Sequence, residues 1–167
     1  MSYIQEMRRI IGRRALFLVG TSVIAVQNGK ILLQLRADSG EWGYPGGYLE
    51  PGETPEESAK REFLEETGLT ANSLNLYGVF AGESRHFAYP NGDEVYVVDV
   101  VFTCTDFSPS GGTHDGEVLE LRWFPFAQLP AEISPPVRDI IQQFIGEQQG
   151  HCPAPHLDWR AGGPCRH

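Results

Sequence analysis

Residues 47–69, GYLEPGETPEESAKREFLEETGL, join a glycine-rich loop to a helix that carries many glutamates. Thr54, Pro55 and Glu57 are typical of a helix start, because a threonine N-cap, a proline in the first turn and a glutamate three residues after the cap form a capping box. Gly68 is typical of a helix end, since glycine adopts the left-handed conformation of a C-cap without strain. The stretch therefore predicts a helix between Pro55 and Gly68.

Three glutamates of this predicted helix share one face. Glu62 and Glu66 are one turn apart, and Glu65 flanks the same stripe. Like charges at this spacing weaken an isolated helix by roughly a few tenths of a kcal/mol per pair, and a solvated face would normally interleave lysines. The arrangement suits a hard divalent cation, which takes oxygen ligands. The preceding glycines, with Glu50 and Glu53 nearby, would let the backbone approach a ligand closely.

The spacing of the fixed residues resembles the Nudix box. The residues that carry the resemblance are Gly47, Glu53, Arg61, Glu62, Glu65, Glu66, Gly68 and Leu69. One position departs from the family pattern: Phe63 stands where an aliphatic residue is usual, which concerns packing under the sheet and no catalytic residue. Residues 42–47 also resemble the usual lead-in, and the hydrophobic pattern extends the resemblance from about Leu16 to about Ile145.

Length and charge limit the class of protein. The 167 residues, 41% of them hydrophobic, fit one compact domain. A net charge of −9 argues against a duplex nucleic-acid binder, which usually shows a basic face, and favours a small nucleotide as the partner. No apolar run reaches the length of a membrane span. Three cysteines without a signal peptide indicate a reducing cytoplasm.

The first 14 residues predict an amphipathic helix of its own. Ile4, Met7, Ile10 and Ile11 recur at helical spacing among arginines. We expect this helix to pack on the rest of the domain or on a second subunit, so a homodimer stays open. A targeting peptide can begin in a similar way, but the immediate passage into a strand disfavours that reading.

Residues 15–148 are expected to form the domain itself. The predicted strands are Leu16–Gln27, Lys30–Arg36, Leu74–Gly82, Val95–Thr105 and Glu117–Phe124. A glycine-rich loop is predicted over Phe107–Gly116, and a last helix from Ser134 to about Glu147. This order fits an α/β protein of the α+β type, a helix–sheet–helix sandwich around a mixed sheet. The Nudix resemblance implies the same α/β/α fold.

Residues 149–167 differ from the domain in composition, because glycines and prolines interrupt any regular element. Histidines and cysteines occur there, but their spacing matches no zinc site. We expect an irregular tail, with a metal site or a Cys152–Cys165 disulfide as the alternatives.

The resemblance implies a chemistry. Nudix proteins hydrolyse a nucleoside diphosphate linked to another group, by attack of water at phosphorus with Mg2+ or Mn2+. Glu62, Glu65 and Glu66 match the metal-binding carboxylates, and the carbonyl of Gly46 matches a backbone ligand. A bound divalent pair would neutralise pyrophosphate oxygens and lower the pKa of a bound water. Arg61 is expected to orient neighbouring carboxylates with its guanidinium.

Glu53, Glu65 and Glu117 are the residues expected to act in catalysis. A metal-bound carboxylate is a poor base, so Glu53 and Glu117 are the candidates for the general base. His86, His114 and Asp115 are weaker options of the same kind, because each residue type is more often a surface polar group than a catalytic one. For substrate binding we expect Arg36 on the phosphates and Tyr48 on a base, with Tyr44, Phe87 and Tyr96 as other aromatic options.

Two functions remain open from the sequence. The first is divalent-metal-dependent hydrolysis of a pyrophosphate linkage in a nucleotide, a dinucleoside polyphosphate or a nucleotide sugar. The second is a catalytically silent Nudix-fold module that binds nucleotides or regulates a partner. A module that only binds has no reason to keep Glu53, Glu62, Glu65 and Glu66 against their mutual repulsion, which favours the enzyme. Ser84 stands where a proline would suggest ADP-ribose as substrate.

Overall fold

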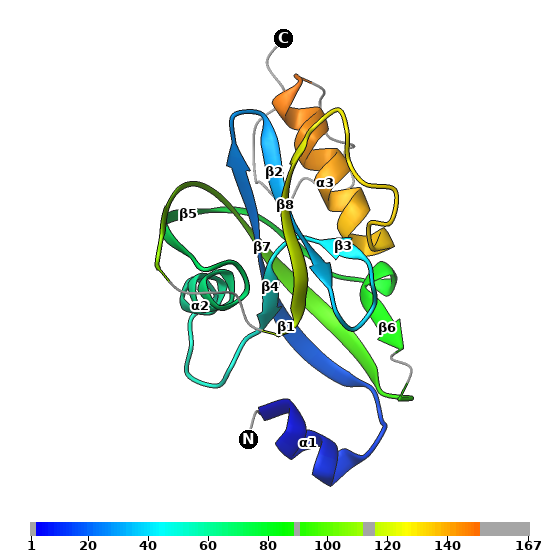
Figure 1. The fold of residues 1–167 in the computed structure, drawn as a ribbon. Helices are drawn as coiled ribbons and strands as arrows, with labels where there is room; N and C mark the ends of the chain where they lie inside the picture. The colour runs from blue at the N-terminus through cyan, green and yellow to red at the C-terminus, as the bar shows by residue number, and fades with distance from the viewer. Residues whose placement is uncertain (1–2, 89–90, 112–115, 151–167) are drawn as a thin grey trace, which may run out of the picture.

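A computed structural model describes residues 3–88, 91–111 and 116–150. Within these ranges the chain forms, in order, α1 (Tyr3–Ile11), β1 (Leu16–Gln27), β2 (Lys30–Arg36), β3 (Trp42–Gly43), β4 (Gly46–Tyr48), α2 (Pro55–Thr67), β5 (Leu69–Phe80), the 3-10 turn η1 (Glu83–Arg85), β6 (His86–Ala88), β7 (Glu94–Pro109), β8 (Val118–Pro125) and α3 (Pro135–Gln148) (Figure 1). In this part of the chain no helix is both long and apolar enough to cross a membrane.

The mixed sheet is built around β1. This strand pairs in parallel with β7, from Leu16 opposite Val95 to Ala25 opposite Cys104. On its other edge it pairs antiparallel with β4 and, at its end, with β2. The main path of the sheet runs β3-β2-β1-β7-β5, with β8 paired to β2 and β6 to β7. The predicted mixed sheet is thereby confirmed.

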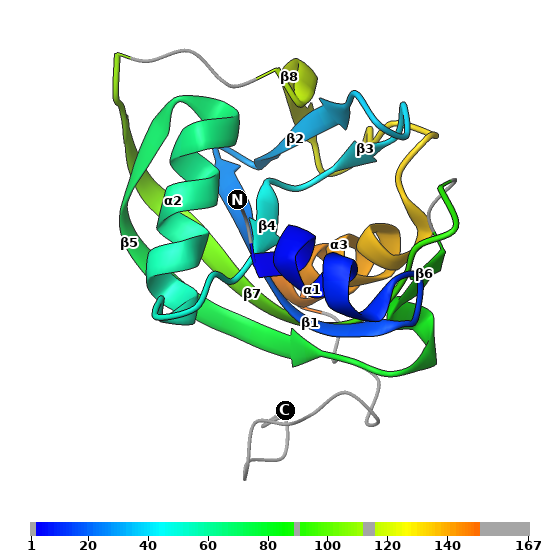
Figure 2. The ribbon, with the colours of Figure 1, turned by 90° about the horizontal axis from the view of Figure 1, so that it is seen from below.

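Alternate residues of β1 face two different helix layers. Val23 packs with Phe63 of α2, whereas Ile24 packs with Ile140 of α3. Leu18, on the same side as Ile24, packs against α1. Figure 2 accordingly shows α2 on one face of the sheet and α1 and α3 on the other. The predicted helix–sheet–helix sandwich is correct, because the strand alternation separates two apolar faces and each takes a helix layer.

The ends of α2 are those that the sequence predicts. Thr54 Oγ1 accepts a hydrogen bond from the backbone N of Glu57 at 3.3 Å, and the backbone N of Thr54 donates to Glu57 Oε2 at 2.8 Å. Gly68 has φ of 68° and donates its N–H to the carbonyl of Leu64 at 2.8 Å. The capping box and the glycine C-cap therefore define the two ends of α2, the helix that carries the glutamate cluster of Glu62, Glu65 and Glu66.

Two strands are longer than predicted. β5 begins at Leu69 instead of Leu74, and β7 continues to Pro109 where a loop was expected from Phe107. The two extensions pair with one another, Leu69 lying opposite Pro109. The Phe107 ring also stacks on Trp123, with 5.6 Å between ring centroids. The prediction of a loop over 107–109 was wrong because long-range pairing and aromatic packing outweigh the local turn signals.

The predicted N-terminal helix is α1, and it packs on the face of the sheet that also carries α3 (Figure 2). Its residues Ile4, Met7 and Ile11 contact the strand residues of β1 and β7, while Ile10 is 73% exposed. Arg8 fixes the helix by donating to the carbonyl of Glu94 at 2.7 Å. The tail predicted over 149–167 lies outside the described residues from 151 onward.

Candidate active site

The glycine loop is seated on β1. Gly46 and Gly47 of β4 lie opposite Ser22 and Thr21. A Cβ on Gly46 would lie 2.8 Å from the Cα and Oγ of Ser22 and nearer still to the carbonyl of Thr21, and a Cβ on Gly47 would overlap the carboxylate of Glu62. Glycine at both positions is therefore what lets the strands and the helix carboxylate approach this closely.

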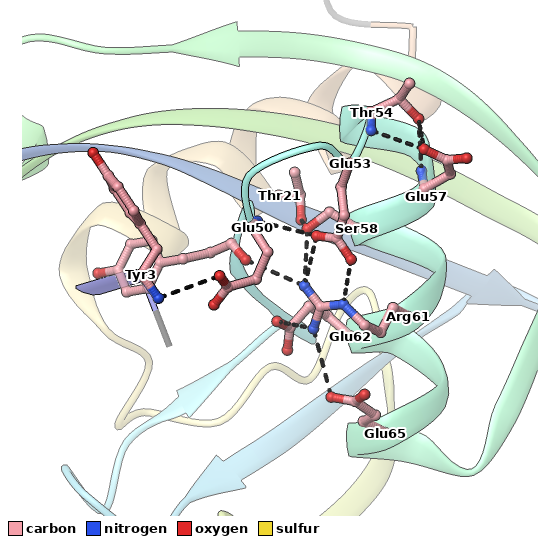
Figure 3. Close-up of polar contacts among 11 residues, drawn as sticks. Tyr3, Thr21, Glu50, Glu53, Thr54, Glu57, Ser58, Arg61, Glu62 and Glu65 are labelled. Carbon is pink, nitrogen blue, oxygen red and sulfur yellow. Dashed lines mark hydrogen bonds and ion pairs between the residues drawn. The ribbon is translucent and has the colours of Figure 1, made fainter. Parts of the chain in front are cut away.

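Arg61 joins the helix to the loop (Figure 3). Its Nε donates to Glu53 Oε1 at 2.6 Å and its Nη2 donates to Glu53 Oε2 at 2.9 Å. Its Nη1 donates to Glu62 Oε1 at 2.6 Å, and Nη2 reaches the carbonyl of Tyr48 at 3.3 Å. These charge-assisted hydrogen bonds lower the pKa of Glu53 to about 2. The predicted orienting role of Arg61 agrees with this geometry.

Further hydrogen bonds surround the Arg61–Glu53 pair. Ser58 and Thr21 share a hydrogen bond of 2.9 Å between their hydroxyl oxygens, and the backbone N of Glu50 donates to Glu53 Oε2 at 3.0 Å. Glu50 in turn accepts from the backbone N of Tyr3, the first residue of α1, at 3.3 Å. The loop is thus connected to β1, α2 and α1 together.

The glutamates on the predicted metal-binding face differ in burial. Glu66 is only 4% exposed, and burial raises its pKa to about 7 although Gly46 N donates to its Oε2 at 2.7 Å. Burial likewise raises the pKa of Glu62, with the charges of Glu65 and Glu117 adding to the shift. The side chain of Glu65 is 51% exposed and its Oε2 lies 3.6 Å from Arg61 Nη1. Glu66 is thus a buried carboxylate held by a backbone N–H, and Glu62 is a half-buried one paired with Arg61.

This environment fits a divalent cation chemically. In the described residues no three Asp, Glu, His or Cys side chains converge closely enough to hold a metal ion as they stand. Arg61 draws Glu62 toward itself, and the Gly46 N–H holds Glu66. The charge of Glu62 nevertheless raises the pKa of Glu66, and a hard cation with oxygen ligands would stabilise the charged forms of both carboxylates.

The other predicted site residues differ in whether they interact with Glu62 and Glu66. Glu117 is exposed and precedes β8 by one residue, yet its charge is close enough to raise the pKa of Glu62. Arg36 forks onto Asp38 with hydrogen bonds of 3.0 and 2.9 Å, and its charge lowers the pKa of Glu66. The side chain of Tyr48 packs among the apolar residues under α1, so only its carbonyl faces Arg61.

The weaker candidates that the structure describes have partners other than the glutamates of α2. His86 stacks on Tyr96, with 4.5 Å between ring centroids, and lies 3.3 Å from a carboxylate oxygen of Glu94. Phe87 packs in the cluster under α1, and Tyr44 is buried in the core of the α3 layer. His114 and Asp115 fall outside the described residues.

Sequence reasoning missed a polar network behind the loop. Asp99 of β7 is 8% exposed and accepts hydrogen bonds from Ser22 Oγ at 2.9 Å and from the Tyr44 hydroxyl at 3.1 Å. Burial raises the pKa of Asp99. The network anchors Tyr44 two residues before Gly46. An acidic residue within the apolar run VYVVDVVF was the available signal, as was the lone glutamine Gln34 within ILLQLR.

The chain is similar in sequence to known proteins along most of its length. The NUDIX domain model matches residues 16–144. The chain belongs to the Nudix family. A MutT-like protein of Streptomyces ambofaciens is 33% identical over 120 residues, covering 71% of this chain and 67% of that protein. An oxidized purine nucleoside triphosphate hydrolase of Danio rerio is 30% identical over 118 residues, covering 66% of this chain and 67% of that protein.

The fold has a solved counterpart in the same family. The crystal structure of a MutT NUDIX hydrolase from Burkholderia pseudomallei superposes with a TM-score of 0.65 at 28% sequence identity. The match covers 77% of this chain and 98% of that one. The chain is accordingly an enzyme of the Nudix hydrolase type.

Proposed function

We propose that this Nudix protein hydrolyses a pyrophosphate linkage in a nucleoside diphosphate joined to another group, with Mg2+ or Mn2+ as cofactor. The observation that carries the proposal is the pair of carboxylates packed against the glycine loop: Glu66, which is 4% exposed, and the half-buried Glu62, both with a raised pKa. A fold stabilised only by packing would place apolar side chains at these positions. We assign the activity to residues 15–148, with α1 as a helix that braces the loop through Glu50.

The proposed ligands are Glu62, Glu65, Glu66 and the carbonyl of Gly46. A bound divalent cation supplies charge neutralisation at the phosphate oxygens and a bound water of lowered pKa. The chain's own contribution is positional: the Gly46 N–H holds Glu66 at Oε2 and Arg61 holds Glu62 at Oε1. One oxygen of each carboxylate is thus held by a hydrogen bond from the protein.

Glu117 is the better candidate for the general base. The Glu53 carboxylate receives two hydrogen bonds from Arg61, and these lower its pKa to about 2, so it takes up a proton poorly near neutral pH. Glu117 is exposed and close enough to Glu62 to raise the pKa of that residue. We therefore propose that Glu53 orients Arg61 while Glu117 accepts the proton of the attacking water.

The proposed substrates are small nucleotides: a nucleoside triphosphate, a dinucleoside polyphosphate or a nucleotide sugar. The net charge of −9 disfavours a polynucleotide, and relatives such as the Danio rerio enzyme are named for a nucleoside triphosphate. Arg36 is the proposed phosphate contact, which requires it to exchange its fork on Asp38 for the substrate. Tyr48 is the proposed contact for the nucleobase. This contact requires α1 to move, because the Tyr48 ring packs under that helix. The proposed location is cytoplasmic, which the odd number of cysteines in the sequence supports.

A substrate panel tests the proposal. Nucleoside triphosphates, dinucleoside polyphosphates and nucleotide sugars would each be incubated with the full chain and Mn2+ or Mg2+, and products separated by anion-exchange chromatography. We expect a nucleoside monophosphate among the products of at least one substrate, because attack falls within the phosphate chain. Tight nucleotide binding without any product would support the silent module instead. Cleavage of phosphomonoesters alone would contradict both readings.

A further inference from the structure

Gln34 is a polar side chain in an apolar setting. It lies in β2 between Leu33 and Leu35, opposite Leu121 of β8 and Gly43 of β3. Its side chain is 1% exposed, and neither its Nε2 nor its Oε1 has a hydrogen-bond partner of normal geometry among the described residues. Burying an amide in this way opposes folding. Stability alone would therefore favour leucine or methionine at this position.

The strand alternation aims Gln34 at the glutamate cluster. Leu33 packs in the core of the α3 layer and Leu32 packs in the α2 layer, so Gln34 points to the α2 side as Leu32 does. There its amide lies beside the Glu66 carboxylate, outside normal hydrogen-bond geometry. Gly46 approaches the same carboxylate from β4, donating to Oε2 at 2.7 Å.

We propose that Gln34 is a positioning residue for Glu66, whose amide donates to the Glu66 carboxylate when that carboxylate serves as a metal ligand. A carboxylate held by the Gly46 N–H at one oxygen can still tilt, and a second donor from β2 fixes its plane. The amide is also suited to the purpose because it adds no charge to a cluster already rich in carboxylates. This inference rests on the proposed function, since it takes Glu66 to be a ligand.

A purely structural role and a positioning role of Gln34 predict similar stability but different metal affinity after an apolar replacement. If Gln34 were only a tolerated buried amide, an apolar replacement of similar size would stabilise the fold and leave metal binding unchanged. If it positions Glu66, the same replacement would stabilise or spare the metal-free fold and weaken metal binding. The Mn2+ dissociation constant of the variant therefore separates the two roles, and its metal-free melting temperature shows that the fold is retained.

The experiment uses the full chain with Gln34→Met, Gln34→Leu and the control Leu32→Met, which changes the same face of β2. Free Mn2+ would be followed by electron paramagnetic resonance without substrate, and melting recorded in EDTA. We expect both Gln34 variants to melt at or above the wild-type temperature and to bind Mn2+ about tenfold more weakly. Leu32→Met should keep the wild-type Mn2+ affinity even where its melting temperature falls.

A kinetic readout supports the binding data. The Mn2+ concentration for half-maximal turnover should rise about tenfold in Gln34→Met, while turnover at saturating Mn2+ stays within about threefold of wild type. Unchanged Mn2+ affinity in both Gln34 variants would overturn the inference. If Glu66→Gln lost Mn2+ binding in the same experiment, the proposed function would stand while the inference fell. Absence of Mn2+ binding by the wild type would overturn both.

Discussion

Arg61 and Glu53 face one another across the start of α2 as a fork of two hydrogen bonds, Nε to Oε1 at 2.6 Å and Nη2 to Oε2 at 2.9 Å. The same guanidinium donates to Glu62 on its own helix. One side chain thus sets the spacing between the loop and the glutamate face. A lysine has a single donor head on a flexible stem and cannot make these contacts together.

We therefore expect Arg61→Lys to lower both stability and activity. Loss of the fork should reduce the free energy of unfolding by about 1–2 kcal/mol, since the pair is only partly exposed. Urea unfolding measures this, and turnover should fall at least about tenfold because Glu62 loses its orientation. Lys60→Gln is the matched control: it breaks the exposed pair with Glu56 and should change stability by under about 0.5 kcal/mol. Equal effects of the two substitutions would argue against the fork.

The stabilisation by Glu53 should depend on pH in the acid range. Hydrogen bonds from Arg61 lower its pKa from 4.5 to about 2 in the folded protein. A folded pKa below the unfolded one stabilises the fold fully above pH 4.5, and this contribution disappears as the pH falls toward 2. The difference in unfolding free energy between wild type and Glu53→Gln should therefore shrink over that range. A difference independent of pH would show that the ion pair does not form in solution.

Glu66→Gln and Glu62→Gln should separate stability from activity. Burial raises the pKa of both carboxylates, so removing the charge should leave the metal-free melting temperature unchanged or higher at pH 8. Turnover should fall by about two orders of magnitude or more. Glu56→Gln, an equal charge change at an exposed position of α2, should keep wild-type turnover. Wild-type turnover in the Glu62 and Glu66 variants would refute the metal assignment.

Divalent metal should stabilise the folded protein. Mg2+ or Mn2+ that binds only the folded state adds RT ln(1 + [L]/Kd) to the free energy of unfolding, or about 2.7 kcal/mol at a hundredfold excess over Kd. Differential scanning fluorimetry should show a rise in melting temperature that EDTA reverses. The rise should be smaller in Glu66→Gln. A flat response of the wild type at millimolar metal would remove the support for a metal site.

Gly46→Ala should destabilise the glycine loop while leaving every carboxylate residue in the sequence. The added methyl would meet Ser22 at 2.8 Å and the Thr21 carbonyl nearer still, and backbone atoms of β1 cannot move aside. We expect a loss of about 2 kcal/mol or more in unfolding free energy. Gly116→Ala, where a Cβ meets nothing within 4 Å, is the control and should be near neutral. A tolerated alanine at Gly46 would mean that β4 is not seated on β1 as described.

The sequence predicted what depends on neighbouring residues. The ends of α2 were correct because Thr54, Glu57 and Gly68 act within one turn of the helix. The ends of β5 and β7 were wrong because Leu69 and Pro109 meet only when the sheet forms. No local pattern reports a partner so far away in the chain.

The same limit applies to the candidate site. The helical period placed Glu62 and Glu66 on one face, but their immediate partners come from tertiary structure: Gly46 N reaches Glu66 from another strand. Tyr48 was assigned to the substrate as an aromatic residue next to the loop, whereas its ring packs under α1. The significance of Gln34 could not be predicted, because it requires the face of β2 and the position of Glu66 together.

The parallel pairing of β1 with β7 has a consequence for the order of folding. Thr21 and Ser22 of β1 pair with the glycine loop. The other edge of β1 has no partner strand until residues 95–104 have been synthesised. Pairings between segments so distant in the chain form slowly, whereas a capped helix such as α2 forms fast. On the ribosome the residues of the glutamate helix are therefore synthesised before the β1–β7 pairing that completes the sheet beneath it can form. A nascent chain that ends before β7 would present the whole box and still lack a working site.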